Sequence, residues 1–163
     1  GNYIETAAGY GDGESEIKIG KALSGRRKEY ILATKSGDRD SKNFQNSIDR
    51  SLGYLKTDYL DLIIMHAVGT REELQAILAP GGAMDGFQKA KQAGKARYVG
   101  ISMHGQPDVL VEALRQYPFD AVMTTINYYD RFNFPEIEDE LIPLALEKVT
   151  CLKGSIGKIP SCS

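Results

Sequence analysis

Apolar segments recur about every 30 residues along this chain, and a segment with helical periodicity follows each of them. We expect strands at residues 2–6, 30–34, 59–65, 97–101 and 120–126, and a sixth at 149–152. Apolar residues three and four apart predict the intervening helices, and one such set is Phe44, Ile48, Leu52 and Leu55. Alternating strand–helix units predict a parallel sheet in an α/β fold.

The type of α/β fold follows from two further observations. The segment at 30–34, Tyr-Ile-Leu-Ala-Thr, is nearly all apolar, which suits a strand that is buried on both faces. No Gly-x-Gly-x-x-Gly follows the first strand, which argues against a dinucleotide-binding doubly wound fold. Evenly spaced units then favour a (β/α)8 TIM-barrel type, whose closed form has eight strands and about 250 residues. The chain supplies five to six units in 163 residues, so we expect an incomplete barrel.

Composition limits the classes of function. The formal net charge is 20 − 22 = −2, which gives no sign of nucleic acid or of an anionic membrane as a partner. No apolar run approaches the roughly 18 residues that a membrane span needs. Cys151 and Cys162 fit neither a disulfide framework nor a metal site, so a reducing, cytoplasmic setting is expected. We predict one partial domain over residues 1–163, with an atypical tail at 149–163.

Polar side chains stand where the predicted strands end. In chain order they are Glu5 with Tyr10 just beyond, Lys35, His66, Ser102 and Asn127. The chemistry of (β/α) barrels lies at the C-terminal ends of the strands. A carboxylate, a phenol, an ammonium and an imidazole are therefore expected to meet at one rim.

These four groups suit carbonyl reduction. A tyrosine in water keeps its proton up to a pH near 10, and a neighbouring lysine cation favours the phenolate. A tyrosine placed in this way can protonate an alkoxide as it forms, while a carboxylate holds the ammonium in position. A neutral imidazole can donate a hydrogen bond that orients the carbonyl group. The hydride has to come from a cofactor, because no side chain supplies one.

Several motifs together resemble the aldo-keto reductase family. They are Asn-Tyr-Ile-Glu-Thr-Ala-Ala-Gly-Tyr-Gly (2–11), Ser-Glu-Ile-Lys-Ile-Gly-Lys-Ala-Leu (15–23), Leu-Ala-Thr-Lys-Ser (32–36), Leu-Lys-Thr-Asp-Tyr-Leu-Asp-Leu-Ile-Ile-Met-His (55–66) and Gly-Lys-Ala-Arg-Tyr-Val-Gly-Ile-Ser (94–102). The resemblance covers residues 1–148 and matches roughly the second to the sixth barrel strands. It implies that Tyr10 is the proton donor, Lys35 its partner and His66 the orienting histidine. It also implies a nicotinamide cofactor, usually NADPH with NADH possible, and a small carbonyl substrate.

The chain departs from the family pattern at the predicted site. Glu5 stands where the family usually has aspartate, so its carboxylate is one methylene further from the backbone. The family pattern implies cofactor contacts at Ser102, Met103 and Met123. Of these, Ser102 matches the pattern, but Met103 replaces an asparagine and Met123 a glutamine. Methionine can pack against a ligand but cannot hydrogen-bond an amide well.

Two other functions are compatible with the sequence. The first is a non-catalytic module that binds a nicotinamide cofactor or regulates a partner. The second is an inactive fragment of a reductase, which would self-associate through the unpaired edges of an open barrel. Loss of turnover in Tyr10→Phe supports the enzyme, whereas cofactor binding without turnover supports the module.

Overall fold

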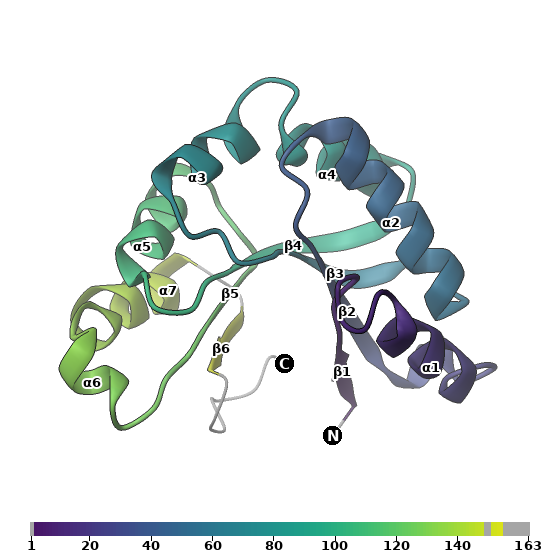
Figure 1. The fold of residues 1–163 in the computed structure, drawn as a ribbon, viewed down its shortest axis with the longest axis horizontal. Helices are drawn as coiled ribbons and strands as arrows, with labels where there is room; N and C mark the ends of the chain where they lie inside the picture. Colours follow the sequence, from purple (N-terminus) through teal and green to yellow (C-terminus); the bar gives the residue numbers. More distant parts are fainter. Residues whose placement is uncertain (1, 149–150, 155–163) are drawn as a thin grey trace. The chain divides into compact units, whose positions relative to one another are not determined.

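The computed structural model describes residues 2–148 and 151–154, with the side chains of 2–130 and 132–148. Strands and helices alternate along most of the chain (Figure 1). In order they are β1 (Tyr3–Glu5), α1 (Glu14–Ala22), η1 (Arg27–Glu29), β2 (Ile31–Ser36), α2 (Ser41–Leu55), β3 (Leu60–Met65), α3 (Arg71–Leu78), α4 (Ala83–Gln92), β4 (Ala96–Ser102), α5 (Pro107–Gln116), β5 (Ala121–Thr124), α6 (Asp130–Asn133), η2 (Ile137–Leu141), α7 (Ile142–Lys148) and β6 (Cys151–Gly154). The predicted strand–helix alternation is confirmed.

The sheet has the topology that the sequence predicts. Its strand order follows the chain, β1-β2-β3-β4-β5-β6, and the pairs β1–β2, β2–β3, β4–β5 and β5–β6 are parallel. Consecutive parallel strands, each followed by helix, make up the (β/α) barrel arrangement. The prediction of an incomplete α/β barrel is therefore confirmed.

The chain divides into two compact units. Unit 1 comprises residues 1–65 and 75–99, and unit 2 comprises residues 66–74 and 100–163. Strands β1 to β3 lie in unit 1 and β5 and β6 in unit 2, while β4 begins in one unit and ends in the other.

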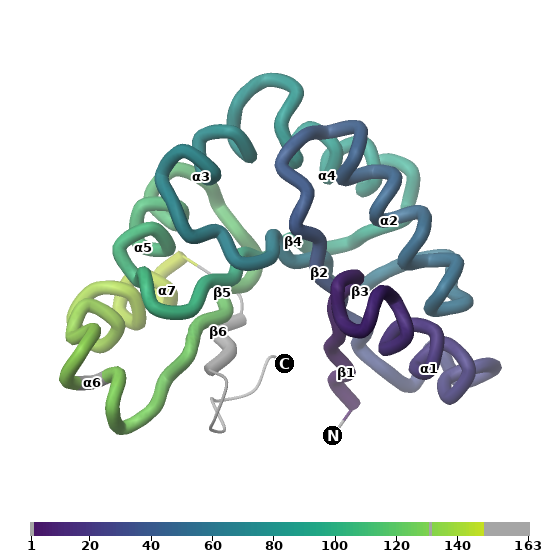
Figure 2. The backbone as a smooth tube through the Cα atoms, viewed as in Figure 1, coloured from purple at the N-terminus to yellow at the C-terminus, as the bar shows by residue number. Residues whose placement is uncertain are grey.

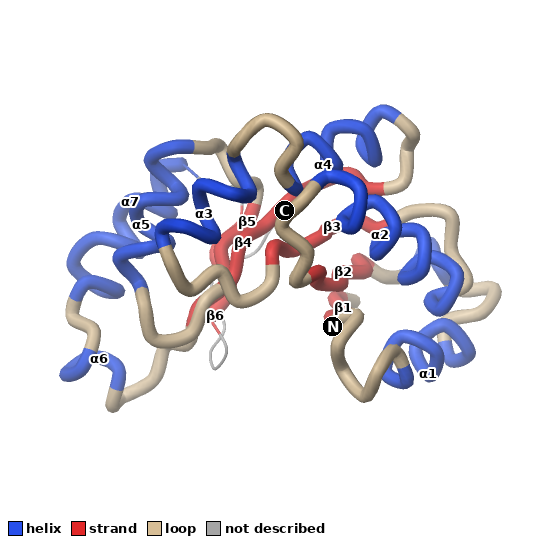
Figure 3. Tube along the Cα trace, turned by 45° about the horizontal axis from the view of Figure 1, so that its top comes forward, coloured by secondary structure: helices blue, strands red, loops and turns tan. Residues whose placement is uncertain are grey.

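The core of unit 1 forms where helices pack along one side of its strands (Figure 3). Helix α2 contacts α1, α4 and β2. The apolar residues that predicted α2 are all buried, namely Phe44, Ile48, Leu52 and Leu55. Gly20 of α1 lies directly against α2, because a Cβ built there would stand 2.2 Å from the Tyr54 carbonyl oxygen. Glycine therefore sets the close approach of these two helices.

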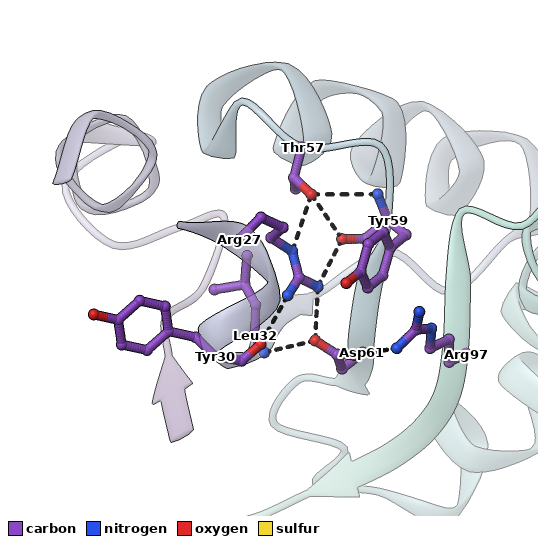
Figure 4. Close-up of polar contacts among 7 residues, drawn as sticks. All are labelled: Arg27, Tyr30, Leu32, Thr57, Tyr59, Asp61 and Arg97. Atoms are coloured by element: carbon purple, nitrogen blue, oxygen red, sulfur yellow. Dashed lines mark hydrogen bonds and ion pairs between the residues drawn. The ribbon is translucent and has the colours of Figure 1, made fainter. Parts of the chain in front are cut away.

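A charged cluster joins the N-terminal ends of β2, β3 and β4 (Figure 4). Asp61 accepts from the Leu32 amide at 2.9 Å, from Arg27 Nη2 at 2.6 Å and from Arg97 Nη1 at 2.9 Å. The two guanidinium carbons lie 3.9 and 4.1 Å from the centroid of the Tyr59 ring. This Asp61 cluster lies at the N-terminal ends of the strands, whereas Lys35 lies near a C-terminal end. Residues at the N-terminal face of such barrels contribute to stability rather than to chemistry.

Unit 2 is built around β5 and α5. Pro107 occupies the first turn of α5, where proline is tolerated because the first turn leaves its N–H groups unpaired. Leu110 and Leu114 of this helix are buried, as is Phe119. Pro143 is the second residue of α7, which follows directly on the π-helical turn η2.

Several predicted boundaries differ from the structure. Strand β2 extends to Ser36, so Lys35 lies inside the strand rather than after it. Strand β5 ends at Thr124, so Asn127 is not at a strand end. The Asn127 side chain instead accepts from the amides of Tyr129 and Asp130 and so orders the start of α6. The sixth strand lies at 151–154, and residues 149–150 of the predicted strand are outside the described residues.

Candidate active site

The first two predicted site residues meet across adjacent strands of unit 1. Glu5 ends β1, and Lys35 lies near the end of β2, two residues beyond the one that pairs with Glu5. Lys35 Nζ stands 2.8 Å from Glu5 Oε1. Only 3% of the lysine side chain and 19% of the glutamate side chain are exposed. Parallel pairing in this register therefore assembles an almost buried ion pair at the carboxyl ends of β1 and β2.

The loop that links β1 to α1 is drawn in purple in Figure 2. From this loop, the Tyr10 hydroxyl reaches the same ammonium. The Ala8 amide donates to the Lys35 carbonyl at 3.1 Å, so the backbone of β2 holds the start of this loop. The loop then turns through Gly11, Asp12 and Gly13, whose φ angles are 59°, 51° and 91°. Three consecutive residues in the left-handed region make the tight return that directs the chain into α1.

The Lys35 ammonium has three hydrogen-bonding contacts. Its Nζ stands 3.3 Å from the Tyr10 hydroxyl oxygen and 3.1 Å from the Thr6 carbonyl oxygen, and it also contacts the Glu5 carboxylate. An ammonium has three hydrogens to donate, so these contacts satisfy it and its charge is paired in the buried site. Nζ is also 4.9 Å from the centroid of the Tyr10 ring. The cation is thus held where it can stabilise negative charge on the phenol oxygen.

Tyr10 itself is accessible. Tyr10 is 46% exposed, whereas its partner Lys35 is buried. A small molecule can therefore reach the phenol from solvent while the ammonium is sealed beneath it. This arrangement can donate one proton and stabilise the anion that remains.

Tyr3 and Thr6 belong to this site, although the sequence analysis did not single them out. The Tyr3 hydroxyl donates to Glu5 Oε2 at 3.1 Å. Burial raises the pKa of Tyr3, and the Glu5 charge and hydrogen bond raise that pKa further. The alternation of a strand could have revealed the contact, because residues two apart lie on the same face. No comparable sequence signal marks the Thr6 carbonyl, which is a backbone group.

His66 follows Met65, the residue of β3 that pairs with Ser36. The imidazole therefore stands at a strand end, as predicted, and the residue is half-buried. His66 begins unit 2, whereas the other three residues lie in unit 1. That the His66 imidazole lies near the Tyr10 phenol stays a prediction.

The three predicted cofactor residues lie together in unit 2. Ser102 of β4 pairs with Met123 of β5, and the Met103 amide donates to the Met123 carbonyl at 3.2 Å. Ser102 Oγ is buried and accepts from the Ala67 amide at 3.2 Å. A serine hydroxyl can also donate a hydrogen bond, whereas thioethers are weak acceptors and cannot donate. Among these three residues, only Ser102 has the chemistry to hold the amide of a nicotinamide.

Metal-binding clusters and membrane-spanning helices are both absent from the part of the chain that the structure describes. No group of three or more His, Cys, Asp or Glu side chains could hold a metal ion there. Within the same residues, none of the helices is both long enough and apolar enough to span a bilayer.

A model of the aldo/keto reductase family matches residues 1–150. The chain belongs to the aldo/keto reductase family. Among curated relatives it is 32% identical over 142 residues to the uncharacterized oxidoreductase YqkF of Bacillus subtilis, a match that spans 80% of this chain and 44% of the relative. It is 33% identical to L-galactose dehydrogenase of Arabidopsis thaliana, over 78% of this chain and 41% of that protein. The chain therefore spans less than half the length of these relatives.

Solved structures of aldo-keto reductases share the fold. The holo form of AKR11C1 from Bacillus halodurans is 32% identical, with a TM-score of 0.68 over 85% of this chain and 49% of that chain. An aldo-keto reductase from Klebsiella pneumoniae in complex with NADPH is 25% identical, with a TM-score of 0.73 over 91% of this chain and 51% of that chain. The match covers about half of each structure, in agreement with an incomplete barrel.

Proposed function

We propose that this chain carries the proton-transfer part of an NADPH-dependent reductase of aldehydes or ketones. The observation that carries the proposal is the contact of one buried ammonium with both the Tyr10 phenol and the Glu5 carboxylate. Family membership supports the class of reaction, because the matching model describes aldo/keto reductases. The NADPH complex of the Klebsiella pneumoniae relative supports the choice of cofactor, with NADH as the alternative.

The residues would act in a defined order. A carbonyl substrate approaches the exposed side of Tyr10, and the phenol hydrogen points to the carbonyl oxygen. As that oxygen gains negative charge, the Tyr10 O–H bond breaks and a substrate O–H bond forms. Lys35 stabilises the phenolate that is left, while Glu5 and the Thr6 carbonyl keep the ammonium in place. In this scheme His66 donates a hydrogen bond that orients the carbonyl group.

The nicotinamide, when bound, would supply the hydride that carbonyl reduction needs. Ser102 is the residue that would hold its carboxamide, through a hydroxyl that is already fixed by the Ala67 amide. Met103 and Met123 would add only apolar contact beside that ring. Among these described residues, one side-chain hydroxyl, that of Ser102, would bind the nicotinamide end of the cofactor.

Kinetics of a single variant test the proposal. Tyr10→Phe removes the transferable proton and leaves the ring, so NADPH-dependent turnover of a panel of aldehydes and ketones should fall by at least about 100-fold. The loss of NADPH absorbance reports turnover, and far-ultraviolet circular dichroism reports the fold. Tyr98→Phe is the matched control, because Tyr98 lies on β4 and is 53% exposed, close to the 46% of Tyr10. Equal turnover in Tyr10→Phe and Tyr98→Phe would contradict the proposal.

A further inference from the structure

We propose that Tyr3 is a positioning residue for the Lys35–Tyr10 pair and that it acts through Glu5, an inference that rests on the proposed function. Tyr3 is linked to Lys35 through the carboxylate of Glu5. Its hydroxyl contacts the carboxylate that holds the ammonium. The four side chains then form one series, from Tyr3 to Glu5 to Lys35 to Tyr10.

The geometry of β1 creates this series. Tyr3 and Glu5 are two residues apart in the strand, so their side chains leave the same face. Each carboxylate oxygen of Glu5 then has its own partner. Oε2 accepts from the Tyr3 hydroxyl at 3.1 Å, and Oε1 contacts Lys35 Nζ at 2.8 Å. With both oxygens engaged, the plane of the carboxylate is fixed.

A glutamate at this position needs such a second contact. Its side chain has three rotatable bonds, and holding a long side chain in one conformation costs up to about 2 kcal/mol of conformational entropy. An ion pair to Lys35 alone leaves the carboxylate free to rotate about its last bond. The Tyr3 hydrogen bond removes that freedom and so sets where the Lys35 nitrogen stands relative to the phenol of Tyr10.

Tyr3 is suited to this role because it stays protonated. Burial raises its pKa, and the neighbouring Glu5 carboxylate raises that pKa further. The hydroxyl therefore donates a hydrogen bond throughout the neutral range of pH. Tyr10, by contrast, is exposed and is the phenol that a substrate can reach.

The test reads the environment of Tyr10 directly. The protein is labelled with tyrosine that carries 13C at the ring carbon bonded to oxygen, and Tyr10→Phe assigns the Tyr10 resonance. In Tyr3→Phe, the Tyr10 resonance should shift, because the ammonium moves relative to the phenol oxygen. In the control Tyr98→Phe, it should stay in place. An unchanged Tyr10 resonance in Tyr3→Phe would overturn the inference.

A second pair of variants separates positioning through Glu5 from a general effect on β1. In Glu5→Gln, the ion pair to Lys35 is already weakened, so adding Tyr3→Phe should shift the Tyr10 resonance no further. If the added substitution shifts it as much as in the native background, Tyr3 acts by another route and the inference is wrong.

Kinetics give the readout that a purely structural role would not move. Tyr3→Phe should lower kcat roughly 10-fold, as expected for a small displacement of the reacting group, and leave KM within about twofold. If Tyr10→Phe is inactive but Tyr3→Phe keeps the unsubstituted kcat, the inference about Tyr3 is overturned and the proposed function stands. Active Tyr10→Phe overturns the proposed function instead, and the resonance experiment still decides whether Tyr3 positions the pair.

Discussion

Replacing Asp61 with asparagine should destabilise the protein by about 3 kcal/mol, because a neutral amide replaces a buried carboxylate that pairs with two arginines. The Asp61 side chain is 12% exposed and its partner Arg27 is 16% exposed, so water screens their contact poorly. A hydrogen bond to a charged group contributes roughly 1.5–3 kcal/mol, and Arg27 is left without its counter-ion. Arg97 is 56% exposed, so its pair with Asp61 adds only about 0–1 kcal/mol.

Urea unfolding followed by circular dichroism measures this prediction. Asp61→Asn should lower the midpoint while the slope m stays constant. In a thermal scan the same loss corresponds to roughly 6–12 °C, at about 2–4 °C for each kcal/mol. Arg97→Met is the control, and we expect it to cost about 1 kcal/mol through the exposed pair and the contact with the Tyr59 ring. If Asp61→Asn costs no more than Arg97→Met, the burial argument is refuted.

Two further predictions concern local structure. Gly20→Ala should cost about 1–3 kcal/mol of stability, because its Cβ would meet the Tyr54 backbone. Gly53→Ala should instead stabilise the protein by about 0.5–1 kcal/mol, because its Cβ would meet no described atom within 4 Å beyond its chain neighbours and its own helix backbone. Denaturant midpoints of the two variants should shift in opposite directions, and shifts of the same sign would be evidence against the packing argument. Asp40 caps α2, and its hydrogen bonds to Asn43 lower the pKa of its carboxyl. The stability that the carboxylate contributes is complete above its ordinary pKa near 4 and is lost as pH falls through the lower folded value. Asp40→Ala should therefore lower the melting temperature at pH 7 and have a much smaller effect near pH 2, and an equal effect at both would disprove the assignment.

The fold could be predicted because its signals are local and repeated. Each strand is a short apolar run, and each large helix has apolar residues at spacings of three and four. Phe44 and Ile48 of α2 belong to the apolar set that predicts this helix, and both are buried. Burial of these faces follows directly from helical geometry, so it needs no knowledge of distant parts of the chain.

The start of α1 does not follow from local sequence preference. Aspartate and serine are good N-cap residues, and Asp12 and Ser15 both lie at this boundary. The N-cap is Gly13, and α1 begins at Glu14. The left-handed turn at residues 11–13 decides the boundary, and the ring of Tyr54 occupies the space beside Gly13. This contact comes from a residue 41 positions further along the chain, so a local pattern could not reveal it.

The candidate site was predicted in part. Reading the strand ends in order identified Glu5 and Lys35, because parallel strands bring their carboxyl ends to one edge. Tyr10 was found from its place just beyond β1, and its contact with Lys35 agrees with that expectation. Tyr3 was not identified, and an aromatic residue in a strand usually indicates packing. Its role depends on the hydroxyl and on the length of the Glu5 side chain, which together place the two atoms 3.1 Å apart.

The central claim is that the Lys35 ammonium supports proton transfer by Tyr10, and the turnover of Lys35→Met tests it most directly. Methionine fills much of the same buried volume without the charge. We predict that kcat for NADPH-dependent reduction of an aldehyde falls at least about 100-fold, with the circular dichroism spectrum unchanged. A Lys35→Met protein that keeps its fold and reduces the aldehyde within twofold of the unsubstituted rate would contradict the account.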